Sequence, residues 1–246
     1  LPRDDMRSIR GNRISMIFQE PMTALNPVHT IGKQICEVLT QHNDLEPDVA
    51  WNRAVEMLDK VGIPSPEIRA TEYPHQLSGG MRQRVVIAIA LACGPELVIA
   101  DEPTTALDPQ ARHMVWGWLQ TLKARGLTMV LTTHDMEEAE RLCDRLVLID
   151  HGKRLVEGEP STLVQQHVGV STLEFLKADP DEVQAVCPSG TDSMEQAGSS
   201  VLVHFGGEEQ AREALNAGLD AGLQVNLRRA SLEDLFLRLT GRALRQ

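Results

Sequence analysis

The sequence has 246 residues, a formal net charge of −11 at pH 7 and only 3% aromatic residues. This length suffices for one large domain, or for a domain with a small appendage, and the apolar composition suits an α/β core. The negative charge argues against a general nucleic-acid-binding protein, which would present a basic face, and no apolar run approaches the roughly 20 residues of a membrane span.

The first predicted strand covers residues 13–18, which are mostly apolar and favour β-structure. It ends at Gln19, where open α/β sheets bind ligands, although an ordinary turn glutamine is the alternative. Residues 30–39 and 48–61 have helical spacing, so residues 21–76 are predicted to form a mainly helical insertion between two sheet strands. An insertion of this size is expected to contact a partner.

A second feature is the run Ser78-Gly79-Gly80, which precedes an apolar stretch with helical periodicity that ends at Gly94. The serine and the glycines are therefore predicted at a helix start, where free backbone N–H groups and the helix dipole favour an anion. Glycine allows the backbone to approach phosphate closely. A Ser-Gly-Gly cap alone is weak evidence, because many helix caps have this composition.

Paired carboxylates follow the next predicted strand. Residues 96–100 are predicted to form a strand whose last four residues are apolar, and Asp101 and Glu102 come directly after them. A carboxylate at a strand end can hold hydrated Mg²⁺, and its neighbour can orient and deprotonate water. The alternative is a solvated acidic turn, which the apolar strand before the pair and Pro103 after it disfavour.

A third strand is predicted at residues 127–132, after a helix at 114–122. It leads to His134, which would reach the same crevice as Gln19 and Glu102 if the three strands are parallel. A histidine that only caps the following helix, predicted at 136–143, is the alternative.

The second half of the chain predicts a hairpin and then a separate α/β segment. The hairpin pairs 146–149 with 154–156, and Ser161 is predicted to cap a short helix. The composition changes after Val170, residues 188–199 are predicted to be a loop, and no catalytic constellation is found past Asp150. The elements predicted after that change are strands at 171–177, 200–205 and 225–229 and helices at 180–187, 208–217 and 231–240.

The C-terminal helix has two local signals. Ser231 and Asp234 resemble a capping box with Asp in place of Glu. Several arginines make this end of the acidic chain basic, and a solvated face that balances local acids is the favoured interpretation for them: Arg228, Arg229, Arg238, Arg242 and Arg245.

The combination of these motifs is far more specific than any one of them. The strand before Gln19, the run LSGGMRQR at 77–84, the run LVIADEP at 97–103, the run Ala-Leu-Asp at 106–108 and His134 occur in one order at sensible spacings. This pattern resembles the nucleotide-binding subunit of ATP-binding cassette (ABC) transporters.

The resemblance implies a role for each motif. Glu102 would be the catalytic base, His134 the switch histidine, and Gln19 the glutamine that senses Mg²⁺ and the attacking water. Asp101 would bind Mg²⁺ and Asp108 would belong to the D-loop. Ser78, Gly79 and Gly80 would be the signature, which contacts the γ-phosphate of ATP held by the opposite subunit.

The resemblance also implies a fold and a domain organisation. The expected fold class is α/β, a P-loop NTPase-like ABC ATPase core lacking its first strands, with a helical subdomain at about 21–94. The core is expected over residues 1–165, and a small C-terminal α/β (α+β) accessory domain over 166–246.

One family motif is missing from these residues. The only Gly-Lys pairs, at 32–33 and 152–153, are not followed by Ser or Thr and have no Gly five residues before, so the pattern GxxxxGK[ST] is absent. We expect a chain truncated at its N-terminus, rather than a natural cassette that never hydrolyses, because Glu102 and His134 are both retained. Loss of a central strand is expected to expose apolar edges and favour aggregation.

Two branches of the family resemble different parts of the chain. Residues 1–108 resemble the ATPases of dipeptide and oligopeptide importers, whereas residues 109–246 resemble the ATPases of nodulation-factor and drug exporters. Our hypothesis is a hybrid joined near Asp108. Amplification from source DNA across codons 95–120 would test it.

The function that the resemblance implies is a transport ATPase with ATP and Mg²⁺ as cofactors. Its partners would be transmembrane permease subunits and a second ATP-binding subunit, with no nucleic acid, at the cytoplasmic face of the inner or plasma membrane. The first alternative is a non-hydrolysing fragment or regulatory cassette, which the missing loop supports. A cassette of DNA repair or translation is the second, but no long coiled coil, zinc site or second cassette supports it.

Overall fold

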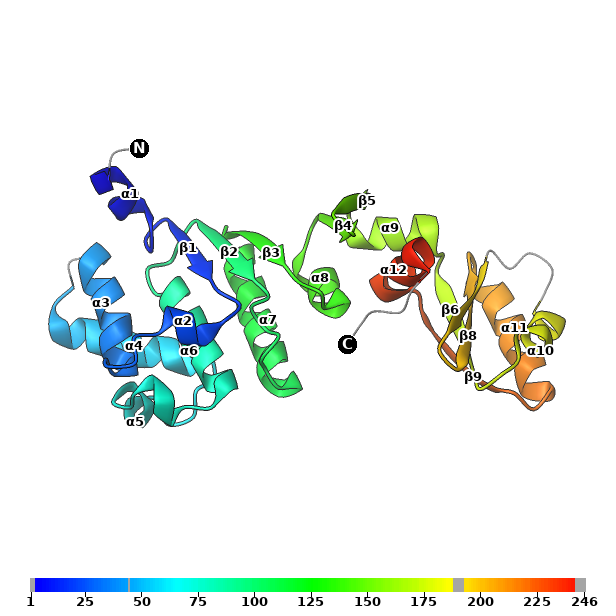
Figure 1. Ribbon diagram of the computed structural model, residues 1–246, viewed down its shortest axis with the longest axis horizontal. Coiled ribbons are helices and arrows are strands. Elements are labelled where there is room, and N and C mark those ends of the chain that lie inside the picture. The colour runs from blue at the N-terminus through cyan, green and yellow to red at the C-terminus, as the bar shows by residue number, and fades with distance from the viewer. Residues whose placement is uncertain (1–2, 44, 188–192, 242–246) are drawn as a thin grey trace. The chain divides into compact units, whose positions relative to one another are not determined.

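The computed structural model describes residues 3–43, 45–187 and 193–241. It divides into two compact units, Leu1–Asp135 and Met136–Gln246, each of which is described by itself (Figure 1). The predicted boundary between 165 and 166 lies within the second unit and stays a prediction.

The first unit is built on a three-stranded parallel sheet in the order β1-β2-β3. Its strands are β1 (Ile14–Ile17), β2 (Leu97–Asp101) and β3 (Thr128–Thr132), at the three predicted positions. Met16 pairs with Ile99, which in turn pairs with Val130, so these side chains share one face. This face is exposed, whereas the opposite one is buried and includes Ile17, Val98 and Ala100.

The predicted helical insertion lies between β1 and β2, as Figure 1 shows. Three of its helices, α2, α4 and α5, begin with proline, which fits the first helical turn because its missing N–H is not needed there. A Cβ on Gly32 would come within 2.6 Å of the Trp51 ring, so glycine allows α3 and α4 to pack closely. The helices of the first unit are α1 (Arg3–Ile9), α2 (Pro21–Ala24), α3 (Ile31–Asn43), α4 (Pro47–Lys60), α5 (Pro66–Ala70), η1 (Pro74–Gln76), α6 (Gly79–Leu91) and α7 (Pro109–Ala124).

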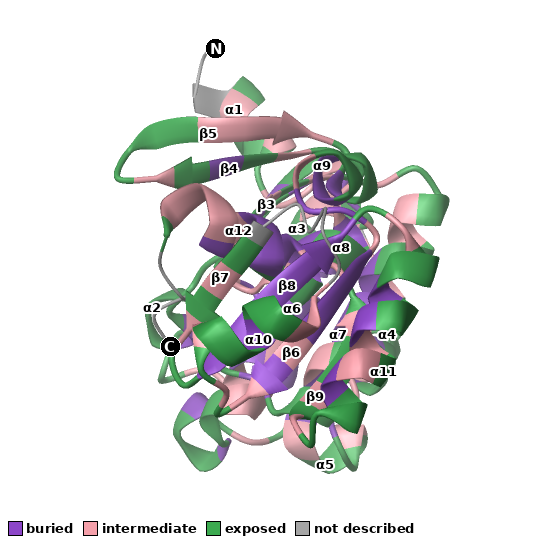
Figure 2. Cartoon of the chain, turned by 90° about the vertical axis from the view of Figure 1, so that its right-hand side faces the viewer, coloured by how far each residue is buried: buried purple, intermediate pink, exposed green. Residues whose placement is uncertain are grey.

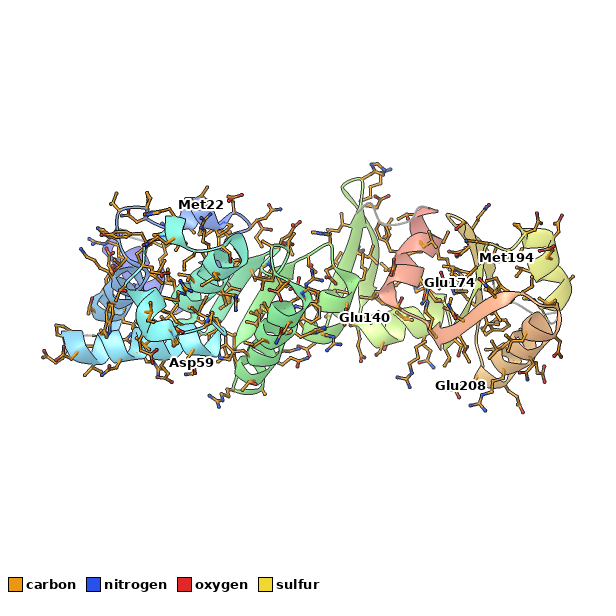
Figure 3. The ribbon with its side chains drawn as sticks, turned by 90° about the horizontal axis from the view of Figure 1, so that it is seen from below. Met22, Asp59, Glu140, Glu174, Met194 and Glu208 are labelled. Carbon is orange, nitrogen blue, oxygen red and sulfur yellow. The ribbon has the colours of Figure 1, made fainter. Side chains whose placement is uncertain are left out.

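The helix α6 connects this insertion to the sheet. Its buried side chains include Val85, Val86 and Ile87, and it packs against α2, α4 and β1. Arg82 donates to the sulfur of Met22 on α2, at 3.3 Å (Figure 3). The start of α6 is therefore positioned by both the insertion and the sheet.

The second unit contains a hairpin and an antiparallel sheet in the order β7-β8-β6-β9. Buried residues line β6 and β8 (Figure 2), and α10 and α11 pack on them through a core that includes Phe175, Val203 and Ala211. The elements are α8 (Met136–Leu142), β4 (Leu146–Asp150), β5 (Lys153–Gly158), α9 (Pro160–His167), β6 (Ser171–Leu176), α10 (Pro180–Val186), β7 (Ser193–Ala197), β8 (Ser200–Phe205), α11 (Glu208–Asp220), β9 (Gln224–Arg229) and α12 (Leu232–Thr240).

A second core of this unit joins its first and last helices. Leu163 of α9 and Leu235 of α12 belong to it, together with Leu148 of β4. Glu140 of α8, labelled in Figure 3, accepts a hydrogen bond from the backbone N–H of Leu232 at the start of α12. Residues 136–168 therefore pack with the C-terminal helix, which explains why the compact units divide at Asp135 rather than near 165.

Two local predictions are wrong. Residues 193–197, part of the predicted loop at 188–199, form β7, which pairs with β8 across a two-residue turn at Gly198 and Ser199; residues 188–192 lie outside the described residues. Gly-Ser is a recognised hairpin turn, so this signal was present in the sequence. Ser161 does not cap α9, whose N-cap is Glu159; its hydroxyl donates to the Glu159 carboxylate instead.

Candidate functional site

The candidate site lies at the carboxyl edge of the parallel sheet. Gln19 follows β1, Asp101 and Glu102 end β2, and His134 follows β3. Because the three strands are parallel, their carboxyl ends meet at one edge, and the structure brings all four of these predicted residues there.

The Glu102 carboxylate is the centre of this group. Its Oε2 accepts hydrogen bonds from Nε2 of Gln19, at 2.9 Å, and from the hydroxyl of Thr105, at 3.3 Å. Nδ1 of His134 lies 3.3 Å from the other oxygen, Oε1. The Glu102 side chain is 25% exposed and that of His134 59%, so the carboxylate is held by three partners yet remains open to solvent.

The backbone of Glu102 has an unusual conformation. Its φ of 43° lies in the left-handed region, which costs a non-glycine residue on the order of 1–3 kcal/mol. The N–H of Glu102 donates to the carbonyl of Thr132, at 2.9 Å, and this bond holds the residue against β3. The conformation turns the chain sharply at the end of β2, where the paired carboxylates lie.

Asp101 is bound to the neighbouring strand. Its Oδ1 accepts a hydrogen bond from the hydroxyl of Thr132, its register partner on β3. Carboxylate and hydroxyl oxygens suit Mg²⁺, which usually keeps several waters and binds through one or two carboxylates and the phosphates of a substrate. Among the residues that the structure describes, no group of three or more His, Cys, Asp or Glu side chains is arranged to hold a metal.

The signature run forms the start of α6, as predicted. Ser78 is the N-cap residue, and its Oγ accepts from the N–H of Met81 at 3.3 Å, which leaves the hydroxyl hydrogen to donate elsewhere. A Cβ on Gly79 would meet nothing within 4 Å, whereas one on Gly80 would lie 3.4 Å from the carbonyl oxygen of Ala106. Gly79 therefore faces open space, and Gly80 packs against the loop that precedes Asp108.

Asp108 caps the next helix rather than joining the carboxylate group. Its Oδ1 accepts from the N–H of Ala111 at the start of α7, at 3.0 Å. This hydrogen bond, assisted by the charge of Arg84, lowers the pKa of the Asp108 carboxyl. Burial lowers the pKa of Arg84, whose guanidinium also donates to the carbonyl of Gly62.

Three residues that sequence reasoning did not single out also contribute to the site. Thr105 and Thr132 donate to the two carboxylates, and Gln83 of α6 donates to the carbonyls of Phe18 and Pro103. Gln83 lies between Arg82 and Arg84 in the sequence, so its burial, and with it the need of its amide for partners, became visible only in the structure. The two threonines had no distinguishing signal, because Thr is common at strand ends.

Two family models match the chain. The model described as "ABC transporter" matches residues 2–105, and the model of the C-terminal domain of the nodulation factor export protein NodI matches residues 182–241. The first covers the candidate site up to Thr105, and the second covers most of the antiparallel sheet and α12.

Curated relatives include ATP-binding proteins named for Nod factor export and for peptide transport. A Nod factor export ATP-binding protein I of Rhizobium sp. (strain N33) is 44% identical over 178 residues, which is 72% of this chain and 58% of the relative. A probable peptide ABC transporter ATP-binding protein of Sinorhizobium fredii (strain NBRC 101917 / NGR234) is 43% identical over 182 residues, 74% of this chain and 54% of the relative. The chain thus spans little more than half the length of these relatives.

Solved structures confirm the predicted fold class. A dimeric ATP-binding cassette in a post-hydrolysis state, bound to ADP and Pi, superposes with a TM-score of 0.58 at 30% identity, covering 65% of this chain and 68% of that one. A second dimeric structure of a bacterial ABC transporter cassette gives the same values. No helix in the described ranges is both long and apolar enough to cross a membrane.

Proposed function

Because the chain belongs to the ABC transporter family, we propose that it is the ATP-binding subunit of a transporter and couples ATP hydrolysis in a dimer to transport through membrane partners. The observation that carries this proposal is the contact of Gln19 and His134 with the two oxygens of Glu102. Relatives that are named for Nod factor export and for peptide transport support the transport role.

Glu102 is the general base in this proposal. Its carboxylate accepts the proton of the water that attacks the γ-phosphate, while Gln19 orients that carboxylate and contacts the water. His134 stabilises the negative charge that develops at the reacting phosphate. Asp101 would hold Mg²⁺, which when bound neutralises phosphate charge.

The signature run serves a second subunit. Gly79 has open space around its Cα, and the free end of α6 presents backbone N–H groups to solvent, so Ser78, Gly79 and Gly80 are suited to a phosphate supplied by another molecule. Dimeric solved cassettes support a second ATP-binding subunit as the source of that phosphate. Asp108 contributes to the D-loop beside Gly80.

The membrane partners are transmembrane permease subunits, contacted through the helical insertion at residues 21–76. In this proposal the subunit is a peripheral protein at the cytoplasmic face of the inner or plasma membrane. Two classes of cargo stay open, peptides by import and lipo-oligosaccharides or drugs by export, because relatives of both kinds are similar to this chain.

The 246 residues by themselves are expected to bind ATP weakly, because they contain no GxxxxGK[ST] loop to cradle the β- and γ-phosphates. We expect no heat of binding in calorimetry with micromolar ATP and Mg²⁺. A micromolar dissociation constant would contradict this part of the proposal and would show that the motifs present suffice for nucleotide binding.

The function itself is tested in a joined cassette, made by fusing the N-terminal segment of the Rhizobium sp. (strain N33) relative ahead of this chain. Glu102→Gln is expected to lower ATP turnover by about 10²–10⁴-fold and to trap an ATP-bound dimer in size-exclusion chromatography. Glu67→Gln, the same change on the exposed surface of α5, is the matched control and should leave turnover unchanged. Near wild-type turnover of Glu102→Gln would refute the base assignment.

A further inference from the structure

Gln83 is a buried polar residue in the middle of α6. Only 1% of its surface is exposed; it lies between Arg82 and Arg84, and the residues that follow, Val85, Val86 and Ile87, are buried and apolar. Burial of an amide among apolar side chains is unfavourable unless the amide is hydrogen-bonded. A leucine or methionine would fill this position without the cost of burying an amide, so the presence of a hydrogen-bonded glutamine here requires an explanation.

The amide nitrogen of Gln83 joins two distant segments of backbone. Nε2 donates to the carbonyl of Phe18 at 3.3 Å and to the carbonyl of Pro103 at 3.0 Å. Phe18 directly precedes Gln19, and Pro103 directly follows Glu102. One side-chain amide therefore holds the backbone beside each of the two residues whose side chains meet at 2.9 Å.

The backbone that Gln83 holds on the β2 side is also the strained one. Glu102 has its φ at 43°, and such a conformation persists only when its surroundings fix it. The N–H of Glu102 is bound to Thr132 on one side, and the carbonyl of the next residue is bound to Gln83 on the other. These two hydrogen bonds fix the backbone on both sides of Glu102.

The same helix begins at the signature run. Gln83 lies four residues after Gly79, about one helical turn, so the amide and the free end of α6 belong to one rigid element. A displacement of the start of α6 is therefore transmitted to the backbone beside Gln19 and Glu102.

We propose that Gln83 is a positioning residue that holds Gln19 and Glu102 in contact and ties this pair to the signature end of α6. The catalytic meaning of the pair rests on the proposed function, but the positioning itself does not. Gln83 contacts no reacting group and acts only through the two carbonyls.

The positioning is tested on the chain itself, without nucleotide, by NMR. In Gln83→Met, which keeps the length and loses the donor, the amide of Glu102 is expected to exchange with solvent at least about tenfold faster, because its backbone loses one of the two hydrogen bonds that fix it. The side-chain NH₂ signals of Gln19 should move towards those of a solvated glutamine. The amide of Val98, in the middle of β2, should keep its exchange rate.

Val86→Ala is the matched control, since it weakens the packing of the same helix without touching the two carbonyls. It should lower the urea midpoint while leaving the Glu102 amide and the Gln19 signals unchanged. Unchanged exchange in Gln83→Met, or an equal change in Val86→Ala, would overturn the proposal.

Gln83→Glu provides an isosteric variant with a pH-dependent donor. As a carboxylate it repels both carbonyls, whereas as a buried carboxylic acid it can donate to one of them. After correction for intrinsic exchange, protection of the Glu102 amide relative to the unmodified chain should be higher at pH 5 than at pH 8. Equal relative protection at both values would count against the proposal, and this comparison remains informative if Gln83→Met does not fold.

In the joined cassette, Gln83→Met should lower kcat about tenfold or more and change the KM for ATP less than about twofold, because a positioning residue acts on the reacting geometry rather than on nucleotide binding. A rise in KM with kcat unchanged would contradict this. If the unmodified joined cassette hydrolyses no ATP, the proposed function fails while the NMR result still decides the role of Gln83.

Discussion

The side chain of Gln19 donates to Oε2 of Glu102 at 2.9 Å and thereby joins the ends of two strands that lie 83 residues apart in the chain. Thr105 donates to the same oxygen, so Oε2 has two donors. Oε1 lies 3.3 Å from Nδ1 of His134. In the proposed mechanism the two oxygens of this carboxylate would have different tasks, Oε2 in orientation and Oε1 in proton transfer.

His134→Ala is therefore expected to lower ATP turnover of the joined cassette by about 10²-fold, because Oε1 loses the imidazole beside it and the reacting phosphate loses a hydrogen-bond donor. Phosphate release measures this. His151→Ala, the same change in the turn between β4 and β5, is the control and should have no effect. Equal turnover of the two variants would show that His134 only contacts Glu102.

Asp234 is the centre of a polar cluster in the second unit. Its carboxylate accepts from the Arg228 guanidinium at 2.6 and 2.7 Å and from the N–H of Ser231 at 2.9 Å, as the predicted capping box requires. Burial would raise the pKa of this carboxyl, but the hydrogen bonds and charge of Arg228 lower it overall. For Arg228 the expected balancing of a local acid is confirmed by its ion pair with Asp234, whereas its side chain, 36% exposed, is only partly solvated.

Asp234→Asn is expected to lower the free energy of unfolding of the second unit by about 2–4 kcal/mol, because it leaves the partly buried Arg228 without its carboxylate. Urea unfolding followed by circular dichroism measures it. All three tryptophans lie in the first unit, so tryptophan fluorescence reports on that unit and should keep its midpoint. Glu233→Gln, at an exposed neighbouring position of α12, is the control, and an equal loss there would refute the role of the ion pair.

His204 and Glu195 face each other in the same cluster. His204 is fully buried, its Nδ1 lies 3.0 Å from the hydroxyl of Thr172, and its Nε2 lies 3.9 Å from Oε1 of Glu195. Nε2 has no hydrogen-bond partner within the described residues. Burial lowers the pKa of His204 and raises the pKa of Glu195; the charges that act on the pair are those of Asp234, Arg228 and Arg238.

The two shifts have opposite effects on stability. A lowered histidine pKa contributes stability that is complete above the unfolded value of about 6.5 and is lost as the pH falls below it. A raised carboxyl pKa contributes stability that is present below the unfolded value of about 4.3 and is lost as the pH rises through the folded value.

Glu195→Gln is therefore expected to stabilise the second unit at pH 7–8, by on the order of 1 kcal/mol, because it removes a buried charge that lacks a close partner. The gain should shrink as the pH falls through the raised folded pKa and disappear well below about pH 4.3, where the carboxyl is protonated in both states. Circular dichroism melts at several pH values measure it. Glu208→Gln, at an exposed position in the first turn of α11, is the control, and a gain that does not depend on pH would contradict the assignment.

The sequence predicted the parts of this structure that depend on neighbours in the chain. The strands that end at Gln19, Asp101 and His134 were predicted from short apolar runs, and their meeting followed from the parallel arrangement. The strand at 193–197 was missed because Ser-Met-Glu-Gln-Ala has no β pattern of its own and is held by its pairing with β8. Gln83 and the Arg228–Asp234 pair act through contacts that only the folded chain creates.

The exposed face of the parallel sheet leads to the last prediction. Met16 is 42% exposed, Ile99 37% and Val130 54%, and the three lie in one register row across all three strands. Parallel sheets are normally covered on both faces, and contiguous apolar patches of this kind favour association. From the sequence, aggregation was predicted to arise at exposed apolar edges of the sheet. The structure shows that this face of the sheet is a further exposed apolar surface.

Met16→Lys with Val130→Lys is expected to raise the solubility of the chain several-fold and to reduce binding of an apolar dye, because two charges interrupt the row. Light scattering and dye fluorescence measure these effects. Val49→Lys, at an isolated exposed apolar position of α4, adds charge without altering the sheet and is the control. If it suppresses association as well as the double variant does, net charge rather than the sheet face governs solubility.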